Sequence, residues 1–97
     1  QVVVVPIAER HHIYAREVHR QLNDAGIRVE LDEENATLGA KIRKAQLQKI
    51  PYILIVGDKE IENRQVSVRD RKDGDMGGFS LPEFLVRIQN QIQSMTM

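Results

Sequence analysis

The stretch Lys49-Ile50-Pro51-Tyr52-Ile53-Leu54-Ile55-Val56-Gly57-Asp58-Lys59-Glu60 decides the fold of this 97-residue chain. Its centre, from Ile53 to Val56, is wholly apolar, and continuous apolarity is typical of a strand that is buried on both faces of a sheet. We predict a strand over residues 50–56, with Pro51 tolerated because it stands at the start of the strand. The run stops at a polar turn led by Gly57.

A second strand is predicted at residues 65–70, where apolar and polar residues alternate. Val66 and Val68 should face the core, because successive residues of a strand point to opposite sides. The outward positions are polar: Ser67, Arg69 and Arg71. Residues 73–78 are expected to form a Gly-rich turn or a short irregular edge strand. A rigid strand that holds fixed polar groups on one side of a sheet is suited to recognition.

The first third of the chain has the pattern strand, helix, strand. Residues 2–7 form another continuous apolar run, which predicts a further strand buried on both faces. Residues 10–25 predict a helix, and Gly26 stands where a helix end favours a left-handed residue. Residues 27–31 alternate between apolar and polar, so they predict a half-buried strand. The apolar face of the helix is assigned to His11, Tyr14, Ala15, Val18, Leu22 and Ala25.

Two more helices are indicated by their start signals. Thr37 can cap a helix over residues 38–49. Ser80 and Glu83 have the spacing of a capping box, in which each side chain accepts a hydrogen bond from the other residue's backbone N–H. The apolar face of this last helix is assigned to Leu81, Phe84, Leu85, Ile88, Ile92 and Met95.

The order of these elements predicts an α/β fold in a single domain over residues 1–97. Three strands linked by helices imply parallel pairing with right-handed crossovers, and the later short connections imply an antiparallel edge. We expect a mixed sheet of four to five strands with helices on both faces, which is a three-layer α/β/α arrangement. A chain of this length can bury one core.

Composition excludes several classes of function. The chain has 14 basic and 14 acidic residues, so a formal net charge of zero gives no global attraction to nucleic acid or membrane. It has no cysteine, which fits a reducing compartment. No apolar run approaches the roughly 20 residues that span a bilayer. Because the chain opens directly on a strand, we expect a fragment cut at a domain boundary or a processed chain.

We expect no catalytic centre, metal site or cofactor site in this chain. Asp32, Glu33 and Glu34 are interpreted as a solvated loop, because no second cluster is spaced to complete an acid–base or metal site. The histidines lack the spacing of metal ligands, so His11 is expected to pack against the core and the other two to lie at the surface. Neither a GxGxxG motif nor an EF-hand loop is present.

One set of polar residues remains, most of them at strand ends, in loops or on one helix. Such positions converge on a crevice beyond the carboxyl ends of the strands in an open α/β sheet. Asparagine, glutamate and arginine can read base edges, and arginine and lysine can hold phosphates. From charge alone, a solvated face with ordinary salt bridges explains the set equally well. Its members are Asn35, Lys41, Arg43, Lys49, Glu60, Arg69 and Arg71.

Nearly the whole chain resembles the C-terminal anticodon-binding domain of threonyl-tRNA synthetases, which are class II aminoacyl-tRNA synthetases. The Gly-Asp-Lys-Glu turn at residues 57–60, the Val-x-Val-Arg-x-Arg strand at 66–71 and Gly-Asp-x-Gly at 74–77 carry the resemblance. Further matching pieces are Gln1-Val2, Ala25-Gly26-Ile27-Arg28-Val29, Gly39-x-Lys41-Ile42-Arg43-x-Ala45, Lys49-Ile50-Pro51-Tyr52-x-Leu54-x-Val56 and Leu81-x-x-Phe84.

The resemblance implies a five-stranded mixed sheet flanked by three helices, and it implies binding of the anticodon loop of tRNA-Thr. In the family the domain reads the second and third anticodon bases, G and U. Arg69 and Glu60 would be the principal base readers, assisted by Asn35 and Lys49. Many members have arginine where this chain has Lys49; lysine cannot make a planar bidentate contact, so a phosphate role is expected there. Lys41 and Arg43 would also hold phosphates.

The resemblance also implies a larger parent enzyme, a threonine–tRNA ligase that performs ATP-dependent aminoacylation. ATP and a catalytic zinc ion would then bind in domains absent from this chain, while the chain itself would be non-catalytic. The parent would be a homodimer in the cytoplasm or an organelle, with no membrane association, and the chain would contact the remaining synthetase domains.

Three alternatives stay open at this point. The related glycine, proline and histidine enzymes carry the same type of domain, and the glycine enzymes can show a similar Val-Arg-x-Arg strand. A flavodoxin-like ligand-binding or signalling domain shares the element order, although a receiver would need acidic residues where Pro6 and Ile7 stand. A protein-interaction domain, homodimeric or not, is the third alternative.

Overall fold

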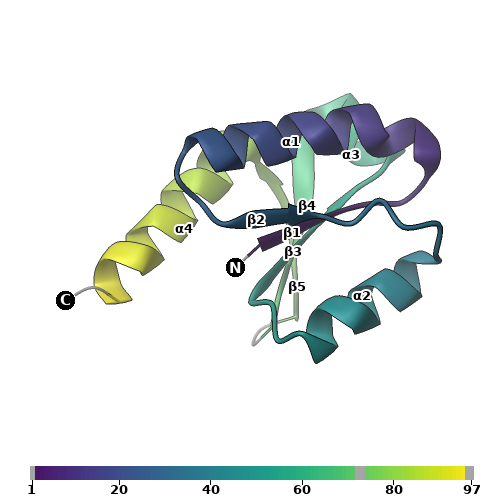
Figure 1. The fold of residues 1–97 in the computed structure, drawn as a ribbon. Coiled ribbons are helices and arrows are strands. Elements are labelled where there is room, and N and C mark those ends of the chain that lie inside the picture. Colours follow the sequence, from purple (N-terminus) through teal and green to yellow (C-terminus); the bar gives the residue numbers. More distant parts are fainter. Residues whose placement is uncertain (1, 72–73, 96–97) are drawn as a thin grey trace.

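The strand predicted at residues 50–56 lies in the middle of a five-stranded sheet with the order β2-β1-β3-β4-β5 (Figure 1). The computed structural model describes residues 2–71 and 74–95, with side chains described as far as residue 90. The strands are β1 (Val2–Pro6), β2 (Val29–Leu31), β3 (Tyr52–Val56), β4 (Gln65–Asp70) and β5 (Gly74–Ser80). The helices are the 3₁₀ turn η1 (Glu9–His11), α1 (His12–Asp24), α2 (Leu38–Leu47), α3 (Asp58–Asn63) and α4 (Leu81–Met95).

The sheet is mixed, as predicted. β1 runs parallel to β2 and to β3, whose register places Val2 opposite Tyr52 and Pro6 opposite Val56. β3 and β4 are antiparallel, and so are β4 and β5. Helices lie on both faces, with α1 and α4 on one side and α2 on the other (Figure 1). The α/β class and the three-layer arrangement are therefore confirmed.

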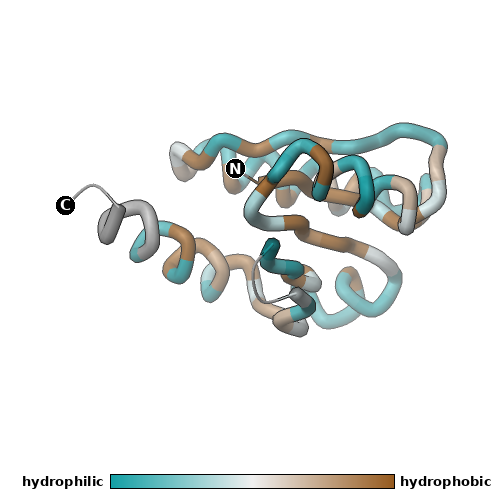
Figure 2. Tube along the Cα trace, turned by 90° about the horizontal axis from the view of Figure 1, so that it is seen from below, coloured by the Kyte–Doolittle hydropathy of each residue, from teal (hydrophilic) through white to brown (hydrophobic). Residues whose placement is uncertain are grey.

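The core has two unequal parts because the helices cover the two faces unequally. On the side of α1 and α4, Leu22, Phe84 and Ile88 pack against alternate residues of β1, β3 and β4. On the side of α2 the cluster is smaller and is built around Val5, Ala45 and other residues of β1 and β3. Figure 2 looks from below at this second side, where α2 lies over the β1 part of the sheet.

Local start and stop signals act as predicted. The Thr37 hydroxyl accepts a hydrogen bond from the Ala40 N–H at 3.2 Å. Ser80 and Glu83 form the reciprocal capping box, with both hydrogen bonds at 3.3 Å. Gly26 has a left-handed φ of +83° at the end of α1. One residue of the predicted apolar face is wrongly placed: Ala25 is exposed, because the helix has already ended at Asp24.

The apolar face predicted for the last helix is confirmed where side chains are described. Leu81, Phe84 and Ile88 are buried, and Leu85 packs partly against the same cluster. Two further members of that face, Ile92 and Met95, lie outside the residues whose side chains the structure describes. The irregular edge strand expected near residue 74 is β5, which pairs with β4 across a bulge at Val68 and Arg69.

The prediction of a turn after β3 was wrong, because a six-residue helix, α3, begins there. Gly57 is the N-cap residue and has an extended backbone. Asp58 and Glu60 lie in the first turn, where their negative charges interact favourably with the positive end of the helix dipole. Arg64 ends the helix in a left-handed conformation with φ of 53°. The segment is short, and no residue of α3 is buried. A helix without a buried face shows no apolar periodicity in the sequence, so this one was not predicted.

A side-chain cluster ties the start of α1 to the start of α3. The Arg10 guanidinium donates two hydrogen bonds to the Asp58 carboxylate, from Nε at 3.0 Å and from Nη2 at 2.6 Å. The buried His11 ring approaches the same carboxylate, with 2.7 Å between Nε2 and Oδ1. We call these three residues, Arg10, His11 and Asp58, the clamp. Hydrogen bonds from Arg10 and then from His11 hold the pKa of Asp58 well below its usual range.

Among the described residues, no helix combines the length and the hydrophobicity of a membrane-spanning segment.

Phe84→Ala should destabilise the fold strongly. The Phe84 ring is fully buried and meets Tyr52 edge-to-face, with ring centroids 5.6 Å apart. Loss of such a side chain costs about 3–5 kcal/mol of unfolding free energy. Urea denaturation followed by circular dichroism measures the change. Val86→Ala on the exposed side of the same helix is the matched control and should change it by less than about 0.5 kcal/mol.

Asp58→Asn should lower the thermal midpoint near neutral pH, and the difference from the wild type should shrink in acid. Because the pKa of Asp58 is lower in the folded state, its carboxylate stabilises the fold above its unfolded pKa of about 3.9. That contribution is lost as the pH falls through the folded pKa. Thermal melts between pH 7 and pH 2 measure the difference, and an equal difference across the range would show that charge is not its source.

Candidate nucleic-acid interface

The half of the sheet formed by β4 and β5 presents a polar surface on the α2 side. Val66 and Val68 of β4 point into the core beneath α1 and α4, so Ser67 and Arg69 point to the opposite side. In β5, Gly78 lies opposite Ser67 and Asp75 lies opposite Arg69. This surface therefore carries small and polar groups around one guanidinium, which suits contact with a polar ligand.

Arg69 has an unusual environment for a surface arginine. Its Nε atom is buried and has no hydrogen-bond partner among the described residues. An unpaired buried donor costs about 1–3 kcal/mol, so such a group in a native fold calls for an explanation. The strand is fixed by Val66 and Val68, which are 0% and 1% exposed. Arg69 is thus a positioned donor without an internal acceptor.

The seven residues predicted as a site do not all converge at the carboxyl ends of the strands. β4 runs antiparallel to β3, so Arg69 lies opposite Ile53, near the start of β3. Arg71 lies at the same end, where its N–H donates to the Pro51 carbonyl at 2.9 Å, and Lys49 precedes Pro51 in the chain. These three residues are brought together at the end of the sheet opposite to the one expected.

The other end of the sheet holds Asn35, Lys41 and Glu60. Asn35 follows β2, and Glu60 belongs to α3, directly after β3. The two groups are separated along β3 by the four residue steps from Ile53 to Gly57, or about 13 Å. The carboxyl ends of the strands therefore gather only part of the predicted set, and the other residues lie at the opposite end of the sheet.

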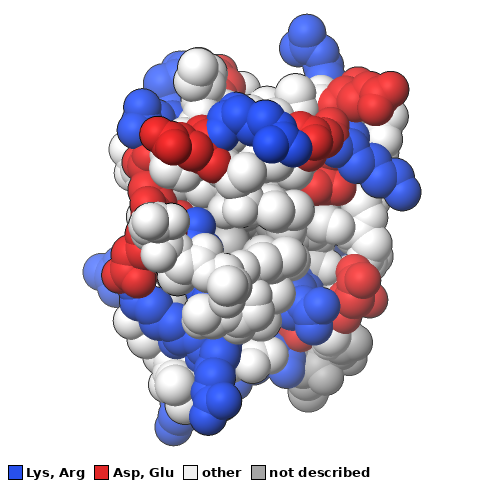
Figure 3. Space-filling model, turned by 90° about the vertical axis from the view of Figure 1, so that its right-hand side faces the viewer, with Lys and Arg blue, Asp and Glu red and all other residues white. Residues whose placement is uncertain are grey.

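A hollow of about 360 Å³ lies at the carboxyl ends of β1 and β2. Figure 3 faces this end of the molecule, where uncharged surface occupies the middle, mixed charges cross the top and Lys and Arg dominate the bottom. The hollow is lined by Ile7, Ala8, Glu9, His12, Glu33, Glu34, Asn35, Ala36 and Lys41. Asn35 is exposed here, so its amide can reach a ligand.

Lys41 does not have the exposure expected of a phosphate-binding residue. It is 4% exposed, and its Nζ donates to the Pro6 carbonyl at 3.1 Å, which ties α2 to the end of β1. This burial does not favour the phosphate role expected for Lys41. Arg43, two residues later on α2, is exposed.

Charge pairing divides the basic residues into two groups. Arg10, Arg16, Arg20 and Lys44 each contact a carboxylate, at distances between 2.5 and 3.9 Å. In the part of the chain that the structure describes, four members of the predicted set form no ion pair: Arg43, Lys49, Arg69 and Arg71. A chain of zero net charge thus keeps unneutralised cations where a recognition surface was predicted, and local charge of this kind attracts polyanions.

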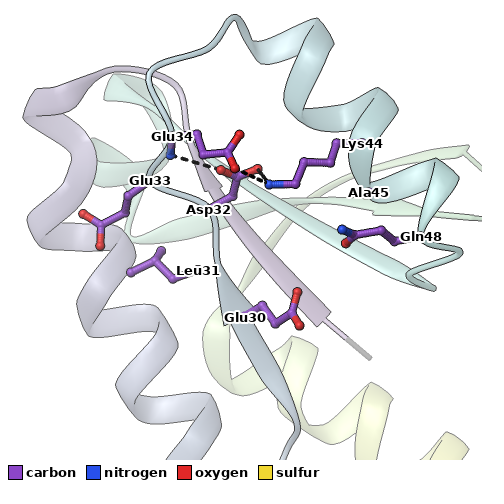
Figure 4. Close-up of a pocket in the computed structure, with 8 residues that line it drawn as sticks. All are labelled: Glu30, Leu31, Asp32, Glu33, Glu34, Lys44, Ala45 and Gln48. Carbon is purple, nitrogen blue, oxygen red and sulfur yellow. Dashed lines mark hydrogen bonds and ion pairs between the residues drawn. The ribbon is translucent and has the colours of Figure 1, made fainter.

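The acidic loop Asp32–Glu34 is tied into the fold and is less solvated than predicted. Asp32 is 9% exposed and accepts a hydrogen bond from the Glu34 N–H at 3.1 Å. Figure 4 shows Lys44 reaching from α2 toward Asp32 and Glu34, beside a small pocket of about 140 Å³. Hydrogen bonds from Arg16 to Glu33 and from Lys44 to Glu34 lower the pKa of each glutamate.

Glu33 and Glu34 are therefore held in the ionised form as partners of nearby cations, which does not suit a general acid. Within residues 2–71 and 74–95, no group of three His, Asp or Glu side chains could hold a metal ion. His12 pairs with Glu33 at 2.9 Å between Nδ1 and Oε2, and His11 is buried as predicted. The hydrogen bonds of His11 in the clamp were not predicted, because its partner Asp58 is 47 residues away.

The solved structures that share this fold include two from tRNA synthetases. One is the RNA binding domain of threonyl-tRNA synthetase from Cryptosporidium parvum Iowa II, with a TM-score of 0.88 and 29% identity over 93% of this chain and 23% of that chain. The other is histidyl-tRNA synthetase from Nostoc sp. PCC 7120, with a TM-score of 0.87 and 27% identity over 95% of this chain and 22% of that chain.

Relatives found by sequence have a higher identity to the chain than these two structures. Threonine–tRNA ligase of Caldanaerobacter subterraneus subsp. tengcongensis is 58% identical over 92 residues, which is 95% of this chain and 14% of that protein. The ligase of Desulforamulus reducens is 50% identical over all 97 residues, or 15% of its length. The chain thus spans about a seventh of these relatives. The family model described as "Anticodon binding domain" matches residues 1–91, and the chain belongs to that family.

Proposed function

We propose that the chain is the anticodon-loop recognition module of a threonine–tRNA ligase and selects tRNA-Thr for ATP-dependent aminoacylation. The observation that carries the proposal is Arg69, a strand-held guanidinium with a buried, unpartnered Nε on an open polar surface. Sequence-specific RNA recognition targets unstacked loop bases, whose edges accept hydrogen bonds from fixed side chains. The threonine assignment is supported by the 58% identity to a threonine–tRNA ligase.

The division of roles follows exposure and pairing. Arg69 and Glu60 read bases: a guanidinium can donate to a base edge, and a carboxylate can accept from an imino N–H. Asn35 assists from the rim of the hollow. Arg43, Lys49 and Arg71 are exposed and hold phosphates. Lys41 supports the site through its hydrogen bond to the Pro6 carbonyl and does not contact phosphate.

The parent protein would supply everything else. ATP and a zinc ion would bind in domains beyond this chain, and the parent would act as a homodimer in the cytoplasm. A related class II synthetase is the second candidate, because histidyl- and prolyl-tRNA synthetases are also structural neighbours, at 27% identity.

Binding to two anticodon stem-loops that differ only in the G and U of the threonine anticodon tests the assignment. The chain should bind the threonine loop more tightly. Arg69→Ala should cost about 1–3 kcal/mol of binding free energy for the threonine loop and little for the altered loop, because one partner of a base contact is removed. Isothermal titration measures both affinities.

Arg20→Ala is the matched control, since Arg20 is an arginine of α1 that is paired with Glu17 and lies outside the proposed site. Equal losses for both loops in Arg69→Ala would leave Arg69 only a phosphate contact. Tighter binding to a histidine or proline loop would favour the second candidate.

Arg43→Ala should weaken binding of both loops by the same factor. A phosphate contact carries no base information, and removing one cation should reduce the slope of log affinity against log salt by about 0.7. Titrations between 50 and about 300 mM salt measure the slope. An unchanged slope would place Arg43 outside the interface.

A further inference from the structure

Asp58 of the clamp lies two residues before Glu60, the carboxylate that is proposed to read a base. Glu60 is the third residue of α3, and its Oε1 lies 3.2 Å from the position that a Cβ on Gly57 would occupy. The carboxylate is therefore folded back over the start of its own helix. No hydrogen bond or ion pair to the Glu60 side chain is present among the described residues. Its direction thus depends on where the first turn of α3 is held.

Burial alone does not fix that first turn. α3 has six residues and none of them is buried. A helix of this length is not stable in isolation, so its position depends on contacts with the rest of the fold. At its first residue, Asp58, three interactions converge within 3.0 Å: two from Arg10 and one from His11.

The other side of the clamp is rigid. His11 is 2% exposed, and its Nδ1 accepts a hydrogen bond from the Ala8 N–H at 3.0 Å. With Nδ1 acting as an acceptor, Nε2 carries the hydrogen and donates to Asp58. The segment before it is joined to β3, because the Ile7 N–H donates to the Val56 carbonyl at 3.0 Å. His11 therefore fixes the start of α3 relative to the two central strands, β1 and β3.

We propose that Arg10, His11 and Asp58 are positioning residues that aim the Glu60 carboxylate at the base it reads. The inference rests on the proposed function. Arg10 adds a planar, bidentate contact that restricts rotation of the Asp58 carboxylate. The clamp itself does not touch the RNA: its effect is on discrimination between bases, through Glu60.

A double-mutant cycle separates positioning from a general effect on the fold. Asp58→Asn should reduce discrimination between the threonine loop and the base-altered loop by about three- to tenfold, because coupled neighbours interact by amounts of that order. In a Glu60→Ala background the same substitution should change discrimination no further. Arg10→Ala provides a second variant, since the Arg10 side chain is 68% exposed and its removal leaves no cavity.

Glu17→Gln is the matched control: it breaks the Arg20 ion pair on α1 and should leave discrimination unchanged. Melting curves verify that each variant is folded at the temperature of the titration. Unchanged discrimination in folded Asp58→Asn and Arg10→Ala would overturn the inference, and so would an equal loss with and without Glu60. If the wild type does not discriminate and Glu60→Ala has no effect, the proposed function fails and the inference fails with it.

Discussion

The pairing of β3 with β1 on one side and with β4 on the other is the constraint on which the rest of the structure depends. The apolar run of β3 can be buried only if both faces are covered, so the chain must provide α1 and α4 on one face and α2 on the other. The parallel partner places loops and α3 at one end of the sheet. The antiparallel partner returns Arg69 to the opposite end, and the positions of the polar groups follow from these two directions.

The acidic side chains form ion pairs with only some of the basic side chains. The acidic residues of the β2–α2 loop and of α1 are occupied by nearby cations, as Glu33 is by Arg16 and Glu34 by Lys44. Arg43, Lys49 and Arg71 have no such partner within the described part of the chain. A protein without net charge can therefore present a locally positive surface, because its carboxylates are neutralised elsewhere.

The sequence predicted most of the fold because its signals were strong and local. β3 and the capping box at Ser80 were found from apolar runs and from residue spacing. α3 was missed because its six residues contain a single apolar one, Ile61, and so have no apolar period. The sequence predicted which residues belong to the candidate site but not how they are arranged in space. That arrangement depends on the direction of β4 and on the burial of Lys41, which are set by the tertiary structure. The clamp could not be predicted, because its partners lie 47 and 48 residues apart.

The antiparallel direction of β4 determines where Arg69 lies and also how far it is from the start of α3. Arg69 and the start of α3 lie about 13 Å apart along the sheet. In a stacked strand, where bases rise by about 3.4 Å, that distance spans several nucleotides. Under the proposed function, a loop would engage both ends at once and gain from their effective concentration, whereas a free nucleotide would reach only one end. In that case the strand order itself would favour the binding of a polymer over the binding of its monomers.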